Sequence, residues 1–316
     1  MAAVFVPGLE LSARYYRDVV APEIRVPHAA ARIGTGSEVL GFDTERSTDH
    51  DWGARLQLFL TPEDTRKHAA ATTSRLPERF GGHPTHVQIV DLGSWFRRQL
   101  GFDPREPIRP RHWLATPTQS LAETTADAVF HDDRGEVTAA RAALAWYPDD
   151  GWRHVLAGQW QRIAEEEAFV GRCGEVGDEL GSAVVAARIA RDIMRLCLLM
   201  RRRYPPYSKW LGSAFAQLPD AATLTPALTA ALTAAGWRGR EAHLVTAYEH
   251  VATVHNELGL TDPVDPTTRD YHDRPFRVLH AERFAEALRT HDDWPPQADQ
   301  YLDTADDGLL REAARR

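Results

Sequence analysis

Apolar and polar residues alternate over the first hundred positions in a way that predicts a small unit of helices and strands. Residues 9–24 form one amphipathic helix, because Leu11, Tyr15 and Val19 recur every four positions. Short apolar runs bounded by turn residues predict strands over residues 29–33, 52–60 and 85–90. Thr61 and Pro62 predict a helix between the last two strands, with Thr61 as its N-cap.

Beyond about residue 101 the helical period dominates. The pattern predicts helices over residues 113–128, 138–146, 151–170, 182–204, 207–217, 224–235, 241–258 and 277–289. The proline- and charge-rich stretch 102–111 marks the change of pattern. We therefore expect an α+β protein with a small mixed-sheet core over residues 1–105 and an all-helical domain over residues 106–316.

Composition narrows the class of protein. The chain has 316 residues, of which 43% are hydrophobic, which is enough for a substantial core. It shows neither a secretory signal pattern nor an apolar run of about 18 residues, so we expect a cytoplasmic protein. Two cysteines exclude a cysteine metal cluster. The net charge of −8 argues against a general nucleic-acid binder.

The stretch from residue 34 to residue 53 carries the candidate chemistry, and it reads "GTGSEVLGFDTERSTDHDWG". Asp49 and Asp51 lead into a predicted strand, where alternate side chains share a face. Two neighbouring carboxylates repel each other unless a cation neutralises them, and Mg²⁺ favours such ligands together with phosphates. Gly36 and Ser37 follow the preceding strand, where backbone N–H groups and a hydroxyl can bind phosphate. The combination predicts metal-dependent phosphoryl or nucleotidyl transfer.

At these residues the chain resembles the DNA polymerase beta-like nucleotidyltransferase superfamily, whose signature is Gly-Ser followed about a dozen residues later by Asp-x-Asp on a strand. The resemblance covers roughly residues 9–100. Along the whole chain the sequence is also similar to an uncharacterised bacterial family of unknown function, through the stretches "GSEVLGFDTERSTDHDWG", "EVGDELGS" and "RRYPPYSKWLG". A small core followed by helices also resembles the aminoglycoside and lincosamide nucleotidyltransferases.

The resemblance implies a third carboxylate on the next strand, which would help to hold the metal and draw the proton from the acceptor hydroxyl. Gln88 occupies the place where the superfamily has this acid, and Asp91 is the only carboxylate on the strand "HVQIVDLG". Either Asp91 takes the role, or it caps the helix that starts at residues 93–94. Ser47 either contacts a phosphate or supports the turn around it.

Glu167 is a candidate general base in the helical half. It falls on the apolar stripe of Trp160 and Ile163, where a carboxylate is costly unless it is paired or used. In the antibiotic-modifying relatives a glutamate of the helical domain can serve as base, which makes Glu167 the candidate here. The alternative is an ion pair between Glu167 and an arginine of the next helix.

Two further sets of cations could bind phosphate. Arg188, Arg191 and Arg195 form one basic stripe on a predicted helix, which is either a clamp for an anionic ligand or a set of salt bridges to nearby carboxylates. Lys209 begins the helix after a double proline, where it either reaches a phosphate or stays exposed.

Together these observations predict a Mg²⁺-dependent nucleotidyltransferase that uses a nucleoside triphosphate (NTP) and a hydroxyl acceptor. We expect a small-molecule acceptor rather than a nucleic acid, no membrane partner, and an active site in a cleft between the two predicted domains. The alternative is a catalytically inactive nucleotide-binding or regulatory protein with the same fold, which Gln88 in place of an acid favours.

Overall fold

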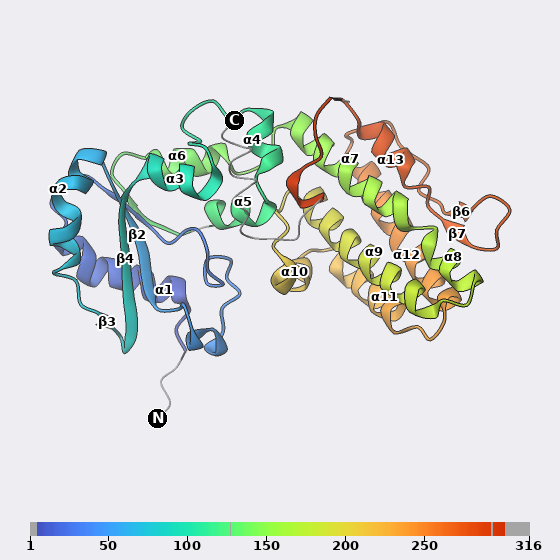
Figure 1. The fold of residues 1–316 in the computed structure, drawn as a ribbon, viewed down its shortest axis with the longest axis horizontal. Helices are drawn as coiled ribbons and strands as arrows, with labels where there is room; N and C mark the ends of the chain where they lie inside the picture. The colour runs from blue at the N-terminus through green and yellow to red at the C-terminus, as the bar shows by residue number, and fades with distance from the viewer. Residues whose placement is uncertain (1–4, 127, 292, 301–316) are drawn as a thin grey trace. The chain divides into compact units, whose positions relative to one another are not determined.

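The computed structural model describes residues 5–126, 128–291 and 293–300. Within these ranges the chain divides into two compact units, one ending at Trp146 and the other beginning at Tyr147 (Figure 1). The first unit holds a mixed five-stranded sheet, and helices dominate the second. The predicted α+β class is therefore confirmed.

The sheet of the first unit has the strand order β3-β4-β2-β1-β5, with β2 and β4 parallel and the other pairs antiparallel. The strands are β1 (Ala29–Ala31), β2 (Ala54–Leu60), β3 (Arg79–Phe80), β4 (His83–Asp91) and β5 (Val129–Asp132). The α-helices are α1 (Gly8–Tyr15), α2 (Pro62–Thr73), α3 (Leu92–Leu100), α4 (Pro110–Ala115), α5 (Thr118–Thr125) and α6 (Glu136–Ala143). Shorter helical turns are η1 (Tyr16–Val20), η2 (Ala21–Glu23) and η3 (Glu45–Asp49).

Helices pack on both faces of this sheet, and β2 contributes apolar side chains to each packing layer. Leu56 and Leu58 pack in one core cluster with Leu11 of α1. On the opposite face Phe59 meets Trp95 of α3 edge to face, with 5.7 Å between ring centroids. Since alternate residues of a strand point to opposite faces, the predicted strand pattern explains both contacts.

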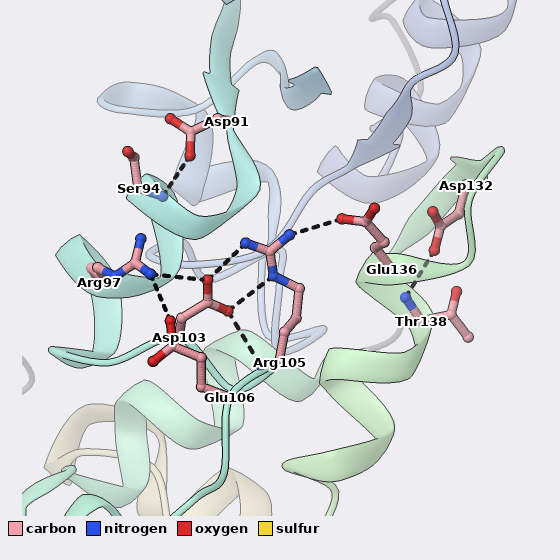
Figure 2. A network of polar contacts seen from close by, with 9 residues as sticks. All are labelled: Asp91, Ser94, Arg97, Asp103, Arg105, Glu106, Asp132, Glu136 and Thr138. Atoms are coloured by element: carbon pink, nitrogen blue, oxygen red, sulfur yellow. Dashed lines mark hydrogen bonds and ion pairs between the residues drawn. The ribbon is translucent and has the colours of Figure 1, made fainter. Parts of the chain in front are cut away.

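The first unit extends well beyond residue 105, where the sequence pattern places the domain boundary. Strand β5 pairs with β1, with Ala30 opposite His131, so these residues belong to the sheet. The predicted linker is also fixed in place, because Arg105 pairs with Asp103 at 2.7 Å and with Glu136 of α6 at 2.8 Å (Figure 2). The prediction missed β5 because its four residues directly follow a longer run with helical periodicity.

The second unit packs helices around buried aromatic residues, and Trp160 stacks on Phe284 with 4.5 Å between ring centroids. Its helices are α7 (Asp149–Glu166), α8 (Phe169–Glu175), α9 (Glu179–Met200), α10 (Ser208–Phe215), α11 (Ala221–Thr233), α12 (Trp237–Glu257) and α13 (Glu282–Leu288), with the short turn η4 (Ala298–Gln300). A hairpin of β6 (Arg269–Asp270) and β7 (Arg277–Val278) departs from the all-helical expectation. None of the described helices combines the length and apolarity needed to cross a bilayer.

Candidate functional site

Two loops meet at one end of the sheet because β1 and β2 run antiparallel. Ala31 lies opposite Gln57, so the chain leaves β1 at the end where it enters β2. Just past the end of β1, the Ile33 N–H donates to the side-chain oxygen Oε1 of Gln57 at 3.1 Å, which holds the departing chain beside β2. The Gly-Ser loop (residues 34–37) and the Asp loop (residues 49–53) therefore lie at the same end of the sheet.

A buried ion pair between Arg32 and Glu38 supports the Gly-Ser loop. Arg32 and Glu38 are each 2% exposed, and Arg32 Nη2 lies 2.6 Å from Glu38 Oε1. The same Nη2 donates to the Thr35 carbonyl at 2.6 Å, and Arg32 Nε donates to Glu38 Oε1 at 2.9 Å. These contacts fix the path of the loop, because a buried guanidinium is stable only when its donors are matched.

Gly36 is required by this arrangement. A Cβ atom there would lie 2.4 Å from Arg32 Nη2 and 2.6 Å from a carboxylate oxygen of Glu38. Because the Thr35 carbonyl points at Arg32, the Gly36 N–H of the same planar peptide points away from it. Among the described residues, neither this N–H nor that of Ser37 has a protein acceptor. The loop thus offers two backbone donors, and the hydroxyl of the half-buried Ser37 stands beside them.

The Asp loop differs from the prediction, which placed Asp49 and Asp51 at the leading end of a strand. Asp49 ends η3, Asp51 has a left-handed backbone with φ of 47°, and β2 starts only at Ala54. The strand starts late because the Trp52 side chain turns inward, and its Nε1 donates to Asp43 at 3.0 Å. Strand alternation therefore does not align the two carboxylates, although both side chains are exposed.

The two aspartates have basic side chains as neighbours. Asp49 Oδ1 lies 2.6 Å from Nδ1 of His50, and the Arg55 guanidinium donates to the Asp51 carbonyl. A metal ion bound to Asp49 would therefore have to replace His50 as the partner of that carboxylate.

Ser47 supports a turn. Its hydroxyl accepts a hydrogen bond from the Thr44 N–H at 3.1 Å, at the start of η3. The next hydroxyl, that of Thr48, donates to the Glu45 carbonyl at 2.8 Å. Of the two interpretations that the sequence left open for Ser47, the structure favours the turn.

Basic side chains lie on the sheet beside these loops. Arg55 of β2 lies opposite His86 of β4. Partial burial lowers the pKa of the His86 imidazole, and the nearby Arg55 and Arg32 lower it further. Sequence reasoning missed Arg32, Glu38 and Arg55 as parts of the site. The available signal was a charged residue inside the apolar run "AAARIG".

Asp91 lies away from the Asp loop. In the parallel pair β2–β4, Ala54 stands opposite Thr85 and Leu60 opposite Asp91. Asp91 is thus six positions beyond the start of β2, about 20 Å at ~3.3 Å per residue. Its carboxylate accepts from the Ser94 N–H at 2.8 Å and caps α3 (Figure 2). Partial burial opposes its charge, but the hydrogen bonds from Ser94 outweigh burial and lower the pKa of Asp91.

The helix-capping interpretation of Asp91 is therefore confirmed. The structure does not bring Asp91 together with Asp49 and Asp51, because the parallel register puts them at opposite ends of the strands.

Glu167 binds backbone rather than an arginine. Its two carboxylate oxygens accept hydrogen bonds from the Leu279 N–H at 2.6 Å and the Ala281 N–H at 2.9 Å. The side chain is buried, with 5% of the residue exposed, and burial raises its pKa to about 7 while the backbone bonds oppose the rise. The expected arginine partner was wrong, because the segment leading into α13 supplies the donors instead.

The arginine stripe of α9 forms salt bridges, as one of the two interpretations predicts. Arg188 pairs with Glu166 at 2.7 Å, Arg191 with Asp192 at 3.1 Å, and Arg195 with Asp299 at 3.5 Å. Lys209 is exposed near the start of α10, with its ammonium 4.8 Å from the centre of the Trp210 ring. The structure thus gives Arg188 and Lys209 local partners within the second unit.

Comparison with protein families finds one match, to a model described as a domain of unknown function (DUF4037), over residues 113–211. This range contains "EVGDELGS" and most of "RRYPPYSKWLG", but neither the Gly-Ser loop nor the Asp loop. Comparisons with curated proteins and with solved structures return no match. The match agrees with the predicted similarity to a family of unknown function and names no activity.

Proposed function

We propose that the protein is a Mg²⁺-dependent nucleotidyltransferase that moves a nucleoside monophosphate from an NTP to a hydroxyl of a small-molecule acceptor. The observation that carries the proposal is the antiparallel pairing of β1 and β2, which brings the Gly-Ser loop and the Asp loop to one end of the sheet. The same end of the sheet thereby carries backbone donors suited to phosphate and candidate metal ligands.

The residues present fit the groups that this reaction needs. Asp49 and Asp51 expose carboxylate oxygens, which are the hard ligands that Mg²⁺ takes together with phosphate oxygens. Bound Mg²⁺ would neutralise the charge of the triphosphate. The Gly36 N–H points away from the buried ion pair, and neither it nor the Ser37 N–H has a protein acceptor among the described residues, so both can hold phosphate oxygens. Arg55 adds a nearby positive charge.

In the proposed reaction the acceptor oxygen forms a bond to the α-phosphorus while the bond to the bridging oxygen breaks. Pyrophosphate leaves with that electron pair, and the acceptor proton passes to solvent. Neither Asp91 nor Glu167 is assigned this proton, because Asp91 caps α3 and Glu167 holds backbone N–H groups. The chain's own contribution is to bind and orient the triphosphate.

A second candidate is a protein that binds NTP without turnover. Gln88 stands in the middle of β4, where the resemblance places an acid, and Gln57 of β2 lies opposite it. A glutamine pair neither holds a cation as strongly as a carboxylate nor accepts a proton. Pyrophosphate release separates the two candidates, because only the enzyme releases it when an acceptor is supplied.

Isothermal calorimetry with a non-hydrolysable NTP, with and without Mg²⁺, tests the proposal. We expect wild type to bind only with Mg²⁺, and the double variant Asp49→Asn/Asp51→Asn to bind at least about tenfold more weakly, a loss of ~1.4 kcal/mol. The control Asp270→Asn/Asp273→Asn removes two charges from exposed positions around the β6–β7 hairpin and should bind like wild type. Equal binding by wild type and the Asp49/Asp51 variant, or no binding by wild type, would refute the proposal.

A further inference from the structure

Three potential metal ligands converge at the other end of β1. Among the described residues, His28, His131 and Asp133 each offer one ligand atom, and these atoms lie within 4.8 Å of one another. His28 directly precedes β1, while His131 and Asp133 come from the end of β5. The Asp133 N–H donates to the His28 carbonyl at 3.0 Å, and the His28 N–H donates to Asp133 Oδ2 at 2.9 Å. Strand pairing therefore fixes the backbone of all three residues.

The Asp133 carboxylate lies between the two imidazoles. Its Oδ1 is 3.0 Å from His131 Nε2, and its Oδ2 is 3.6 Å from His28 Nδ1. Ligand atoms around a metal with bonds of about 2.0 Å are ~3.3 Å apart in tetrahedral geometry. The three ligand atoms, all within 4.8 Å of one another, are close to that spacing, and the His131 and Asp133 side chains are partly exposed.

Tyr16 orients the most buried of the three ligands. Its hydroxyl lies 2.8 Å from His28 Nε2, and the Val26 carbonyl lies 3.0 Å from His28 Nδ1. In the structure Nδ1 carries a proton and donates it to the Val26 carbonyl, because a carbonyl oxygen only accepts. A metal ion at Nδ1 would displace this hydrogen bond and leave the proton on Nε2, which then donates to Tyr16. Such a hydrogen bond to the second ring nitrogen is typical of metal-ligating histidines. The Val26 carbonyl then stands beside the coordination sphere as a further oxygen.

The cluster opens into a hollow of about 720 Å³ at the surface, lined in part by Arg25, His131 and Arg134. Solvent or an anion can thus reach the fourth coordination position, and the two arginines favour an anion. The hollow is separate from the proposed nucleotide site, because the hollow lies where β1 begins and the Gly-Ser loop lies where β1 ends. The six positions from His28 to Gly34 span about 20 Å when extended.

We infer that His28, His131 and Asp133 form a site for a divalent first-row transition metal, with Zn²⁺ as the ion of best fit. Two imidazole nitrogens and one carboxylate oxygen with an open fourth position are a ligand set that Zn²⁺ takes in proteins. Mg²⁺ prefers oxygen ligands alone, so this site and the Asp loop differ in the ion that they select. A bound ion would link the segment before β1 to the end of β5.

Calorimetric titration of chelator-treated full-length protein with Zn²⁺ tests the inference. We expect one equivalent to bind to wild type, and at least about tenfold weaker binding (~1.4 kcal/mol) by His131→Gln and Asp133→Asn. The control His68→Gln alters an exposed histidine of α2 that also lies near an aspartate, 3.9 Å from Asp64, and should bind like wild type. No binding by wild type, or equal binding by His131→Gln, would overturn the site.

Two further readouts separate coordination from a merely structural defect. Co²⁺ bound to these ligands in four-coordinate geometry should give strong visible absorption, and weak absorption typical of six oxygen ligands would contradict the inference. Zn²⁺ at a hundred times its Kd should raise the Tm of the first unit by about 5–10 °C. The Asp49→Asn/Asp51→Asn variant should keep Zn²⁺ binding, so failure of the nucleotide proposal and failure of this one are distinguishable.

Discussion

Replacing Glu38 with glutamine tests whether the buried ion pair holds the Gly-Ser loop. Glu38 Oε1 accepts from both Nε and Nη2 of Arg32, and both side chains are almost fully buried. Glutamine keeps the shape and one acceptor oxygen but removes the charge. The Arg32 guanidinium would then remain buried without a counter-charge among its hydrogen-bond partners.

The expected loss of unfolding free energy is large compared with the total stability of a domain. Removing one partner of a buried ion pair costs about 3–5 kcal/mol, whereas whole domains are stable by about 5–15 kcal/mol. With a urea slope of about 2 kcal/mol per molar, a loss of about 4 kcal/mol lowers the midpoint of unfolding by about 2 M. The Gly-Ser loop should also lose its order, since Arg32 Nη2 binds the Thr35 carbonyl.

Urea unfolding of the first unit, followed by circular dichroism, provides the assay. Glu63→Gln is the matched control, because Glu63 also pairs with a cation, Lys67 at 2.5 Å, but both side chains are more than half exposed. The control midpoint should move by no more than about 0.3 M. A Glu38→Gln midpoint as close to wild type as the control would refute the reasoning that this pair supports the loop.

Three further predictions follow from particular contacts. Glu167 has a folded pKa of about 7 against a usual 4.5, so its contribution to stability is full below pH 4.5 and is lost as the pH rises through 7. Glu167→Gln should therefore remove a pH-dependent term of about 3 kcal/mol from urea unfolding curves, whereas an unchanged pH profile would contradict the shift. Asp91→Ala should destabilise α3 by about 1 kcal/mol and leave calorimetric NTP binding unchanged, and reduced binding would place Asp91 in the site after all. Gly36→Ala should abolish NTP binding, because the added Cβ atom would clash with Arg32. Gly212→Ala should leave NTP binding unchanged, because a Cβ atom there has no neighbouring atom within 4 Å. Equal NTP binding by the two variants would refute the close packing of Gly36 against Arg32.

The parts of the fold that depend on local signals could be predicted from sequence. Thr61 caps α2 as expected, because its hydroxyl accepts from the Asp64 N–H at 3.0 Å, only three residues away. Strands β2 and β4 were found because each contains a short run of apolar residues, which are buried in β2 and partly buried in β4. Strand β5 was missed, because a short strand at the sheet edge is defined by its partner β1 and not by its own pattern.

The candidate site was predicted in part. The sequence placed Gly36 and Ser37 after β1 and the two aspartates at the leading end of the next strand. The antiparallel register puts both loops at one end of the sheet, but both aspartates precede β2. The distance of Asp91 from this end was not predictable, because the parallel register of β2 and β4 depends on tertiary packing.

The partners of Glu167 were equally hidden, since the N–H groups that it binds lie 112 and 114 residues further along the chain. An apolar helical stripe shows that a carboxylate is buried, but it does not show which distant donors satisfy that carboxylate.

Hydrogen exchange of backbone amides tests the central claim most directly, namely that the Gly-Ser loop and the Asp loop form one Mg²⁺–nucleotide site. The measurement compares exchange over residues 32–53 with Mg²⁺ alone, with a non-hydrolysable NTP alone, and with both. The account predicts that amide exchange slows in residues 34–37 and 49–53 together, and only when Mg²⁺ and the NTP are both present. The Asp49→Asn/Asp51→Asn variant should show no such slowing. Protection confined to other parts of the chain, or protection of these loops without Mg²⁺, would contradict it.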